Sequence, residues 1–162
     1  MSRLHRIGLV TALATLSVVA GVQAATVAGS EAEAKQAITA RQEVFKEIKK
    51  LNDPMGKMLR RQAPIDPALV ATNAAKIQEL AGKIPEHFTV DTRKFKDIKT
   101  AAMDGIWNSE ADFKSKADGL VQAAGAAVEA GKSGDAGATQ KSLIGIGKAC
   151  GACHDSYKAK ID

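Results

Sequence analysis

Apolar residues recur every three or four positions in four separate segments of the chain, which is the period of an α-helix. These segments run from about 30 to 59, from 67 to 84, from about 109 to 130 and from 135 to the end. None shows the alternation of apolar and polar residues that is typical of strands. Because four helices of this length joined mostly by short turns pack naturally against one another, the sequence predicts an all-α fold, an antiparallel four-helix bundle.

The expected helix starts carry capping signals. Ser30 with Glu33 matches a capping box, and Asp66 followed by Pro67 matches an N-cap with proline at the first helical position. Pro54 lies inside the first segment and predicts a kink or a division there. The positions expected to face inward on the first helix are Ile38, Arg41, Phe45, Ile48, Met55 and Leu59. On the last helix they are Leu143, Ile146, Cys150, His154 and Tyr157.

The predicted core contains few large side chains. Aromatic residues make up only 4% of the chain, and many inward positions are alanine or glycine. Such a core either leaves room for a large planar guest or closes up by tight alanine packing, and composition does not choose between the two. The segment 86–108, which holds Trp107, is expected to be a loop that wraps a ligand, because long loops are usually functional.

Residues 1–24 have the pattern of a secretory signal peptide. Arg3 and Arg6 give a basic start, an apolar run follows from 7 to 22, and V-Q-A places small residues at a cleavage site after Ala24. The run is short and rich in threonine for a membrane span, which needs about 20 apolar residues. We therefore predict that 25–162 is one exported domain, periplasmic and without membrane attachment after cleavage.

The charge of the exported part is modest. Two of the 23 Lys and Arg residues belong to the signal peptide, so 21 remain against 18 Asp and Glu, a net charge of +3. No basic block with interleaved aromatic residues is present, which gives no support to nucleic-acid binding. The exported part has two histidines and no Ser/His/Asp set, so we do not predict an enzyme.

The only two cysteines, Cys150 and Cys153, are followed directly by His154. A disulfide between them would close a tiny loop and constrain the unfolded chain very little. Cys-x-x-Cys-His is the attachment signature of c-type haem. On a helix the three side chains share one face, so the thiols can form thioethers with the two vinyl groups of one porphyrin edge while the imidazole binds iron.

Two other interpretations of these residues are weaker. A thioredoxin-like redox pair belongs to a βαβ context, which this sequence lacks. A zinc site would need His87 as a fourth ligand beside Cys150, Cys153 and His154. Adjacent cysteine and histidine ligands make poor tetrahedral geometry. The sequence therefore favours one covalently bound haem c.

The second axial position of the iron is expected to be open. Only eight residues follow His154, and none is methionine or histidine. On the first helix, Phe45 is the residue expected to face the iron. Met55 lies ten residues further along, about 15 Å at 1.5 Å per residue, so one helix does not bring both beside the same metal.

Four stretches of the chain resemble the cytochromes c′, a family within the class II cytochromes c. They are A-R-Q-E-V-F-K at 40–46, Q-A-P-I-D at 62–66, I-W-N-S-E-A-D-F-K at 106–114 and C-G-A-C-H-D-S-Y-K at 150–158. The resemblance covers nearly all of 25–162. It implies a four-helix bundle, usually a homodimer, with one five-coordinate haem c that binds nitric oxide and carbon monoxide.

The resemblance also implies roles for single residues. Arg41 and Gln42 match the pair beside the haem propionates, Phe45 matches the bulky residue over the vacant iron face with Ile48 in the same wall, and Lys158 matches a basic proximal residue. The residues themselves leave two alternatives open for Arg41. A guanidinium on an apolar stripe needs an anionic partner such as a propionate, or its head reaches solvent at the bundle edge.

In one place the chain departs from the family pattern. The family commonly has Pro-Glu before Ile-Trp, where this chain has Asp104-Gly105. A propionate contact from that loop, with Thr100 as candidate, therefore does not follow from the resemblance.

The expected function is the binding of small neutral diatomic gases, chiefly nitric oxide. Phe45 and Ile48 offer hydrocarbon and no hydrogen-bond donor, which bound dioxygen needs far more than nitric oxide or carbon monoxide does. The alternative is an electron-transfer cytochrome of class II, c556-like, with a small redox partner. Low-spin relatives place a methionine over the iron from the first helix, where this chain has Phe45.

Overall fold

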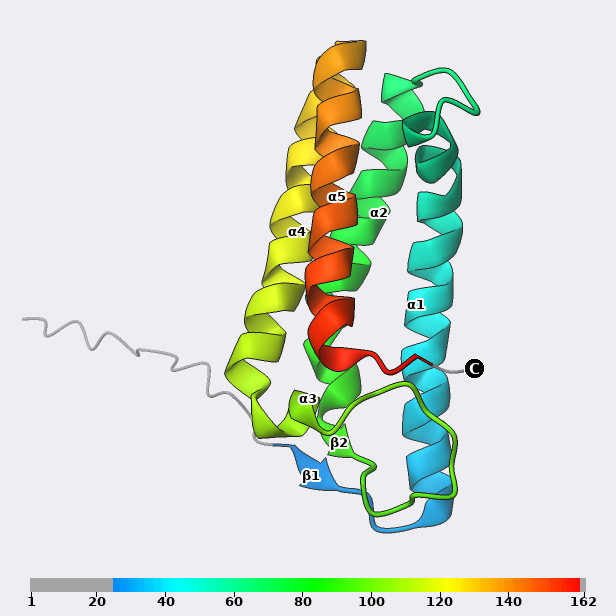
Figure 1. Cartoon of the computed structure of the whole chain (residues 1–162), viewed down its shortest axis with the longest axis vertical. Helices are drawn as coiled ribbons and strands as arrows, with labels where there is room; N and C mark the ends of the chain where they lie inside the picture. Colours follow the sequence, from blue (N-terminus) through cyan, green and yellow to red (C-terminus); the bar gives the residue numbers. More distant parts are fainter. Residues whose placement is uncertain (1–24, 161–162) are drawn as a thin grey trace, which may run out of the picture.

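The computed structural model describes residues 25–160, so the predicted signal peptide lies outside the described residues. Four long helices, α1 (Glu31–Leu59), α2 (Pro67–Lys83), α4 (Glu110–Lys132) and α5 (Ala136–Tyr157), run side by side as an antiparallel bundle (Figure 1). The predicted all-α four-helix bundle is confirmed. Among the described residues, no helix combines the length and the hydropathy that a membrane crossing requires.

Side-chain caps fix the starts of three helices where the sequence predicts them. The side chains of Ser30, Asp66 and Asp135 each accept a backbone hydrogen bond from the residue three positions later, at 3.2, 3.0 and 2.8 Å. The capping box is modified, because the Glu33 carboxylate accepts from the Gly29 N–H at 2.8 Å. Each cap satisfies a donor that the first helical turn would otherwise leave unpaired.

Pro54 does not divide the first helix, since α1 continues through it to Leu59. A proline inside a helix removes one backbone donor. Close to this point α2 supports α1, because the Asn73 side-chain amide donates to the Leu51 carbonyl at 2.9 Å. The expected inward stripe needs correction: Phe45 and Leu59 are only half-buried, whereas Val44, Leu51 and Met58 are buried although the stripe did not include them.

The connection from α2 to α4 is more ordered than the predicted loop. It contains a 3₁₀ helix η1 (Pro85–Phe88), a strand β2 (Val90–Asp91) and a helical turn α3 (Gly105–Asn108). Strand β1 (Thr26–Val27) pairs in parallel with β2 through backbone bonds of 2.7 and 2.9 Å. The sequence predicted no strand. Two residues are too few to show a period of two, and the pairing satisfies extended backbone that water would otherwise have to solvate.

The bundle is tightest where α2 crosses α4. A Cβ added at Gly131 would lie 2.5 Å from the Pro67 carbonyl oxygen and 2.7 Å from the Ala71 nitrogen. Ala74, Ala81, Ala124 and Ala127, which are all fully buried, continue this small-residue contact.

Candidate functional site

A cavity of about 620 Å³ lies between the four long helices and the connection that precedes α4. This volume is in the range of about 300–1,000 Å³ that cofactor and ligand pockets occupy. Most of its wall is hydrocarbon, contributed by Ile38, Phe45, Ile48, Ile77, Ile84, Phe88, Ile106, Phe113, Ala117, Leu120, Ile146 and Ala149. The few large side chains of the core therefore leave room for a guest, which settles the alternative that composition left open.

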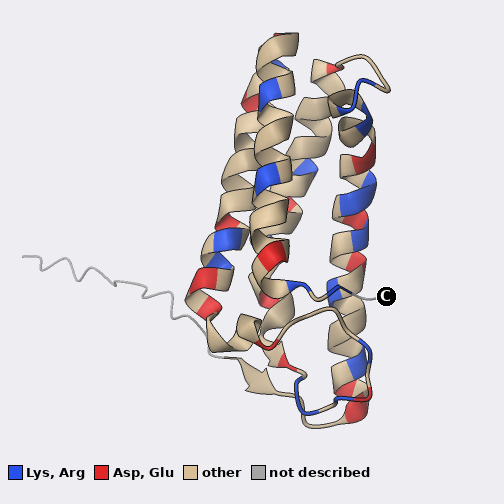
Figure 2. Ribbon diagram, in the orientation of Figure 1, with Lys and Arg blue, Asp and Glu red and all other residues tan. Residues whose placement is uncertain are grey.

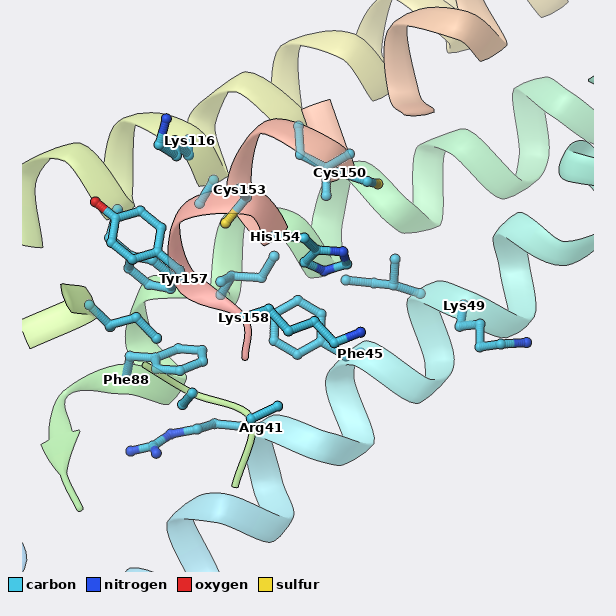
Figure 3. Close-up of a pocket in the computed structure, with 18 of the residues that line it drawn as sticks. Arg41, Phe45, Lys49, Phe88, Lys116, Cys150, Cys153, His154, Tyr157 and Lys158 are labelled. Carbon is cyan, nitrogen blue, oxygen red and sulfur yellow. The ribbon is translucent and has the colours of Figure 1, made fainter. Parts of the chain in front are cut away.

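Helix α5 presents Cys150, Cys153, His154 and Tyr157 to this cavity (Figure 3). Residues three and four apart share one face of a helix, so the motif places both sulfurs and the imidazole on the same wall. Both cysteines are half-buried free thiols, and burial raises the pKa of each. Burial, with the positive charge of Lys158, lowers the pKa of His154. A lowered pKa favours the neutral form of the imidazole, which is the form that binds a metal.

Helix α1 forms the opposite wall. The Phe45 and His154 ring centroids are 6.5 Å apart at an interplanar angle of 63°, and the Phe45 and Phe88 centroids are 6.4 Å apart. Ile48, which is 7% exposed, lines the cavity one turn further along. The residue predicted to face the iron thus stands across the cavity from the predicted iron ligand.

Arg41 is buried in this wall at 3% exposure, so its head does not reach solvent. Its Nε donates to the His87 carbonyl at 2.8 Å, Nη1 donates to Thr92 Oγ1 at 3.1 Å, and Nη2 donates to the Val90 carbonyl. The guanidinium carbon also lies 4.7 Å from the Phe88 ring centroid. Burial lowers the pKa of Arg41 to about 10. The solvent-reaching alternative is therefore wrong, and the direct partners include no carboxylate.

These contacts use three of the five N–H groups of the guanidinium. Arg41 lines the cavity, so the remaining donors belong to a buried cation beside a space that can admit an anionic group. Its contact with a haem propionate stays a prediction. The structure adds a second role, which is to fasten the segment from η1 to β2 against α1.

An ion pair behind Arg41 is not visible in the sequence pattern. The Asp91 carboxylate is 7% exposed and accepts from the Arg93 guanidinium at 2.7 and 2.9 Å. Hydrogen bonding from Arg93 lowers the pKa of Asp91, and the positive charge of Arg41 lowers it further. Arg93 also donates to Asn108 Oδ1 at 2.6 Å and so joins β2 to α3. Asp91 and Arg93 are only two residues apart, but nothing in the residue pattern shows that the Asp91 carboxylate is buried near Arg41, so the sequence did not predict this pair.

A second network fastens the end of α5 to α4. The Tyr157 hydroxyl donates to Asp112 Oδ2 at 2.6 Å, and this hydrogen bond raises the pKa of Tyr157 to about 12. The Tyr157 ring packs edge-on against Phe113 at a centroid distance of 5.3 Å. The Tyr157 backbone carbonyl accepts from Met103 N at 3.1 Å. These contacts set the position of the helical turn that carries His154.

Three further predicted residues line the cavity. Gln42 and Lys158 are exposed at its edge, and the half-buried Thr100 accepts a hydrogen bond from Ala102 N at 3.2 Å. Their contacts with a bound group stay predictions. Within residues 25–160, no group of three or more His, Cys, Asp or Glu side chains is placed to hold a metal ion by itself. The zinc alternative, which needed His87, therefore finds no ligand set in the described part of the chain.

Comparison with known proteins identifies a group of similar chains. Residues 36–158 match the family model described as Cytochrome C'. A cytochrome c' of Rubrivivax gelatinosus is 33% identical over 125 residues, which cover 76% of this chain and 95% of the relative. A cytochrome c-556 of Agrobacterium tumefaciens is 31% identical over 124 residues, covering 76% and 94%.

A solved structure agrees with these sequence matches. Cytochrome c prime from Shewanella frigidimarina superposes with a TM-score of 0.70 and is 33% identical. The superposition covers 78% of this chain and 97% of that one. The likeness therefore extends over the four-helix bundle that encloses the cavity.

Proposed function

This chain belongs to the cytochrome c′ family, and from that premise we propose that it is a periplasmic haem protein that binds small neutral diatomic gases, chiefly nitric oxide, at a five-coordinate iron. Family members carry covalently bound haem c, and this chain is a haem c protein of the same kind. The cavity of about 620 Å³, with both thiols and one imidazole on a single wall, fits that group.

Within this proposal each residue of α5 has a separate task. Cys150 and Cys153 hold the porphyrin through thioethers, and His154 supplies the only protein ligand to the iron. Covalent attachment keeps the group on a small exported protein that could otherwise lose it. The Tyr157–Asp112 hydrogen bond of 2.6 Å supports the turn that carries the imidazole.

The observation that carries gas binding is the hydrocarbon wall opposite His154. The Phe45 ring stands 6.5 Å from the His154 ring, with Ile48 one turn away. The Phe45 side chain can neither bind iron nor donate a hydrogen bond. Distal polarity, hydrogen-bond donors and steric access decide which diatomic ligand a haem binds. A site of this kind discriminates against dioxygen and favours nitric oxide and carbon monoxide.

Arg41 and Gln42 are proposed to face the haem propionates, as the family pattern implies. A propionate near Arg41 would place an anion beside a guanidinium that is only 3% exposed and whose direct partners are carbonyl and hydroxyl oxygens. A charge-assisted bond of this kind is stronger than a neutral one and orients the bound ring.

Electron transfer is the second candidate, because a relative at 31% identity is named cytochrome c-556. Optical spectra of the purified ferric and ferrous holoprotein, with and without carbon monoxide or nitric oxide, separate the two functions. Without gas, we expect high-spin spectra for both the ferric and the ferrous protein. When carbon monoxide or nitric oxide is added, the Soret band of the ferrous protein should shift at once. A low-spin ferric spectrum with a methionine–iron charge-transfer band would exclude the open site and favour the carrier.

The proposed role is binding and not catalysis. Haem-peroxidase turnover needs a distal acid or base, and Glu43 and Glu47 on α1 are both exposed and paired with lysines of their own helix. Stopped-flow measurement with hydrogen peroxide tests this point. Turnover at rates typical of haem peroxidases would contradict it.

A further inference from the structure

The charged side chains that line the cavity are all basic. They are Arg41, Lys46, Lys49, Lys116 and Lys158, and no aspartate or glutamate lines it. The chain from 25 to 162 has a net charge of only +3, so this distribution is local and does not reflect the whole protein. Because Arg41 is buried, the four lysines carry the charge that faces solvent around the cavity.

Antiparallel pairing adds two more lysines to this edge. Lys158 bridges to Ala102, and Ala159 N donates to the Ala101 carbonyl at 2.9 Å. Lys160 directly follows Ala159 on one paired segment, and Lys99 lies two residues before Ala101 on the other. We call Lys99, Lys158 and Lys160 the basic patch. All three are exposed, and Figure 2 shows basic residues both along the connection before α3 and at the end of α5.

The basic patch differs from the other lysines that line the cavity. Lys46, Lys49 and Lys116 each lie within 3.7 Å of a carboxylate one turn away on their own helix. Among residues 25–160, no carboxylate lies within ion-pair distance of the three patch lysines. Three of the lysines on the cavity wall are thus each partnered by a carboxylate, whereas within residues 25–160 the patch lysines are not. A low-dielectric cavity edge lined by one sign of charge focuses the field toward solvent.

We propose that the basic patch is the docking surface for an acidic electron-donor protein that reduces the haem. The inference rests on the haem site proposed above, because the patch adjoins the cavity wall at Thr100, Ala102 and Lys158. The donor gives one electron to the ferric iron, which becomes ferrous while the donor's own centre is oxidised, and no covalent bond forms or breaks. Such a donor would keep the iron in the ferrous state that carbon monoxide requires.

The experiment measures reduction of the ferric holoprotein by a reduced, acidic plant-type [2Fe–2S] ferredoxin in a stopped-flow instrument at several ionic strengths. The test variant is the double substitution Lys99→Gln/Lys160→Gln, because neither side chain lines the cavity. The matched control is Lys57→Gln/Lys141→Gln. It removes the same charge from exposed lysines near the end of α1 and the start of α5, at the other end of the bundle (Figure 1).

We expect the test variant to lower the second-order rate constant about 3- to 10-fold at low ionic strength, since removing steering charges slows encounter. The control should change it less than about 2-fold, and salt of about 0.5 M should abolish the difference by screening. The cationic reductant hexaammineruthenium(II) should react no more slowly with the test variant than with the parent. Equal slowing by both double variants, or rates independent of salt, would overturn the proposal.

Carbon monoxide binding to dithionite-reduced protein separates this inference from the proposed function. Dithionite supplies the electron without docking, so the test variant should bind carbon monoxide as the parent does. If the reduced parent does not bind carbon monoxide, the gas-binding function fails while the docking measurement still stands. If the parent binds gas normally and the ferredoxin rates show no dependence on the basic patch, only the docking inference fails.

Discussion

Arg41 offers the sharpest test of how the cavity wall is held in place. Arg41→Met keeps much of the hydrocarbon of the side chain and removes the donors to His87, Val90 and Thr92. A buried acceptor left unpaired costs about 1–3 kcal/mol. Two of the three acceptors are backbone carbonyls, whose position is fixed by the pairing of the connecting segment. Removing the buried charge recovers part of the loss, because burial already lowers the pKa of Arg41 to about 10.

The balance of these effects is a loss of about 2–4 kcal/mol in the free energy of unfolding. Urea unfolding of the ferric holoprotein, followed by far-ultraviolet circular dichroism, gives this quantity from the midpoint when the slope is unchanged. Arg41→Lys should lose about 1–2 kcal/mol, because one ammonium group cannot serve three acceptors and stack on Phe88. Arg60→Met is the control. Arg60 is exposed and its Nε donates to Gln62 Oε1 at 3.3 Å in an exposed hydrogen bond, so its loss should change stability by less than about 0.5 kcal/mol. If Arg41→Met and Arg60→Met have equal effects, Arg41 does not fasten the wall.

Three further predictions concern packing, gas access and pH. Gly131→Ala should destabilise the holoprotein by about 1–3 kcal/mol in urea, because its Cβ would meet backbone atoms at 2.5 and 2.7 Å. Gly119→Ala in the same helix meets nothing within 4 Å and should stabilise by about 0.5–1 kcal/mol, so a loss at both sites would contradict the packing. Phe45→Ala should speed carbon monoxide binding to the ferrous protein at least about 10-fold in flash photolysis, because it removes the ring that blocks the open face of the iron. An unchanged rate would show that this ring does not limit access. The hydrogen bond from Arg93 holds the pKa of Asp91 below its ordinary value of 3.8. The stability that Asp91 contributes is therefore complete when the pH is above 3.8. It is lost as the pH falls through the lower pKa of Asp91 in the folded state. Unfolding curves of Asp91→Asn should therefore lose less stability than those of the parent between about pH 4 and pH 2, and parallel acid limbs would argue against the ion pair.

The sequence predicted those features whose signals are local. Ser30, Asp66 and Asp135 start helices through hydrogen bonds to backbone three residues away, so each start can be recognised from a few neighbouring letters. The haem motif is equally compact. Cys150 and Cys153 lie within about one turn of His154, so helical geometry alone places them on one wall.

The features that the sequence did not predict depend on distant partners. Arg41 bonds to the carbonyls of His87 and Val90, 46 and 49 residues away, and backbone carbonyls leave no mark in the residue pattern. The pairing of β1 with β2 involves two residues on each side, too few for any periodicity. The length of the connection predicts a ligand-binding role, and Phe88, Thr100 and Ile106 within it line the cavity. Its internal order depends on contacts with residues far away in the sequence, such as those of Arg41.

Intact-mass spectrometry of the protein purified from the periplasm of cells with competent cytochrome c maturation machinery tests the central claim most directly. The account predicts a single species whose mass is that of residues 25–162 plus one haem. It also predicts that Cys150→Ala/Cys153→Ala yields the bare polypeptide under the same conditions. If the unmodified protein itself appears at the mass of the bare polypeptide, the covalent haem site and the functions built on it are contradicted.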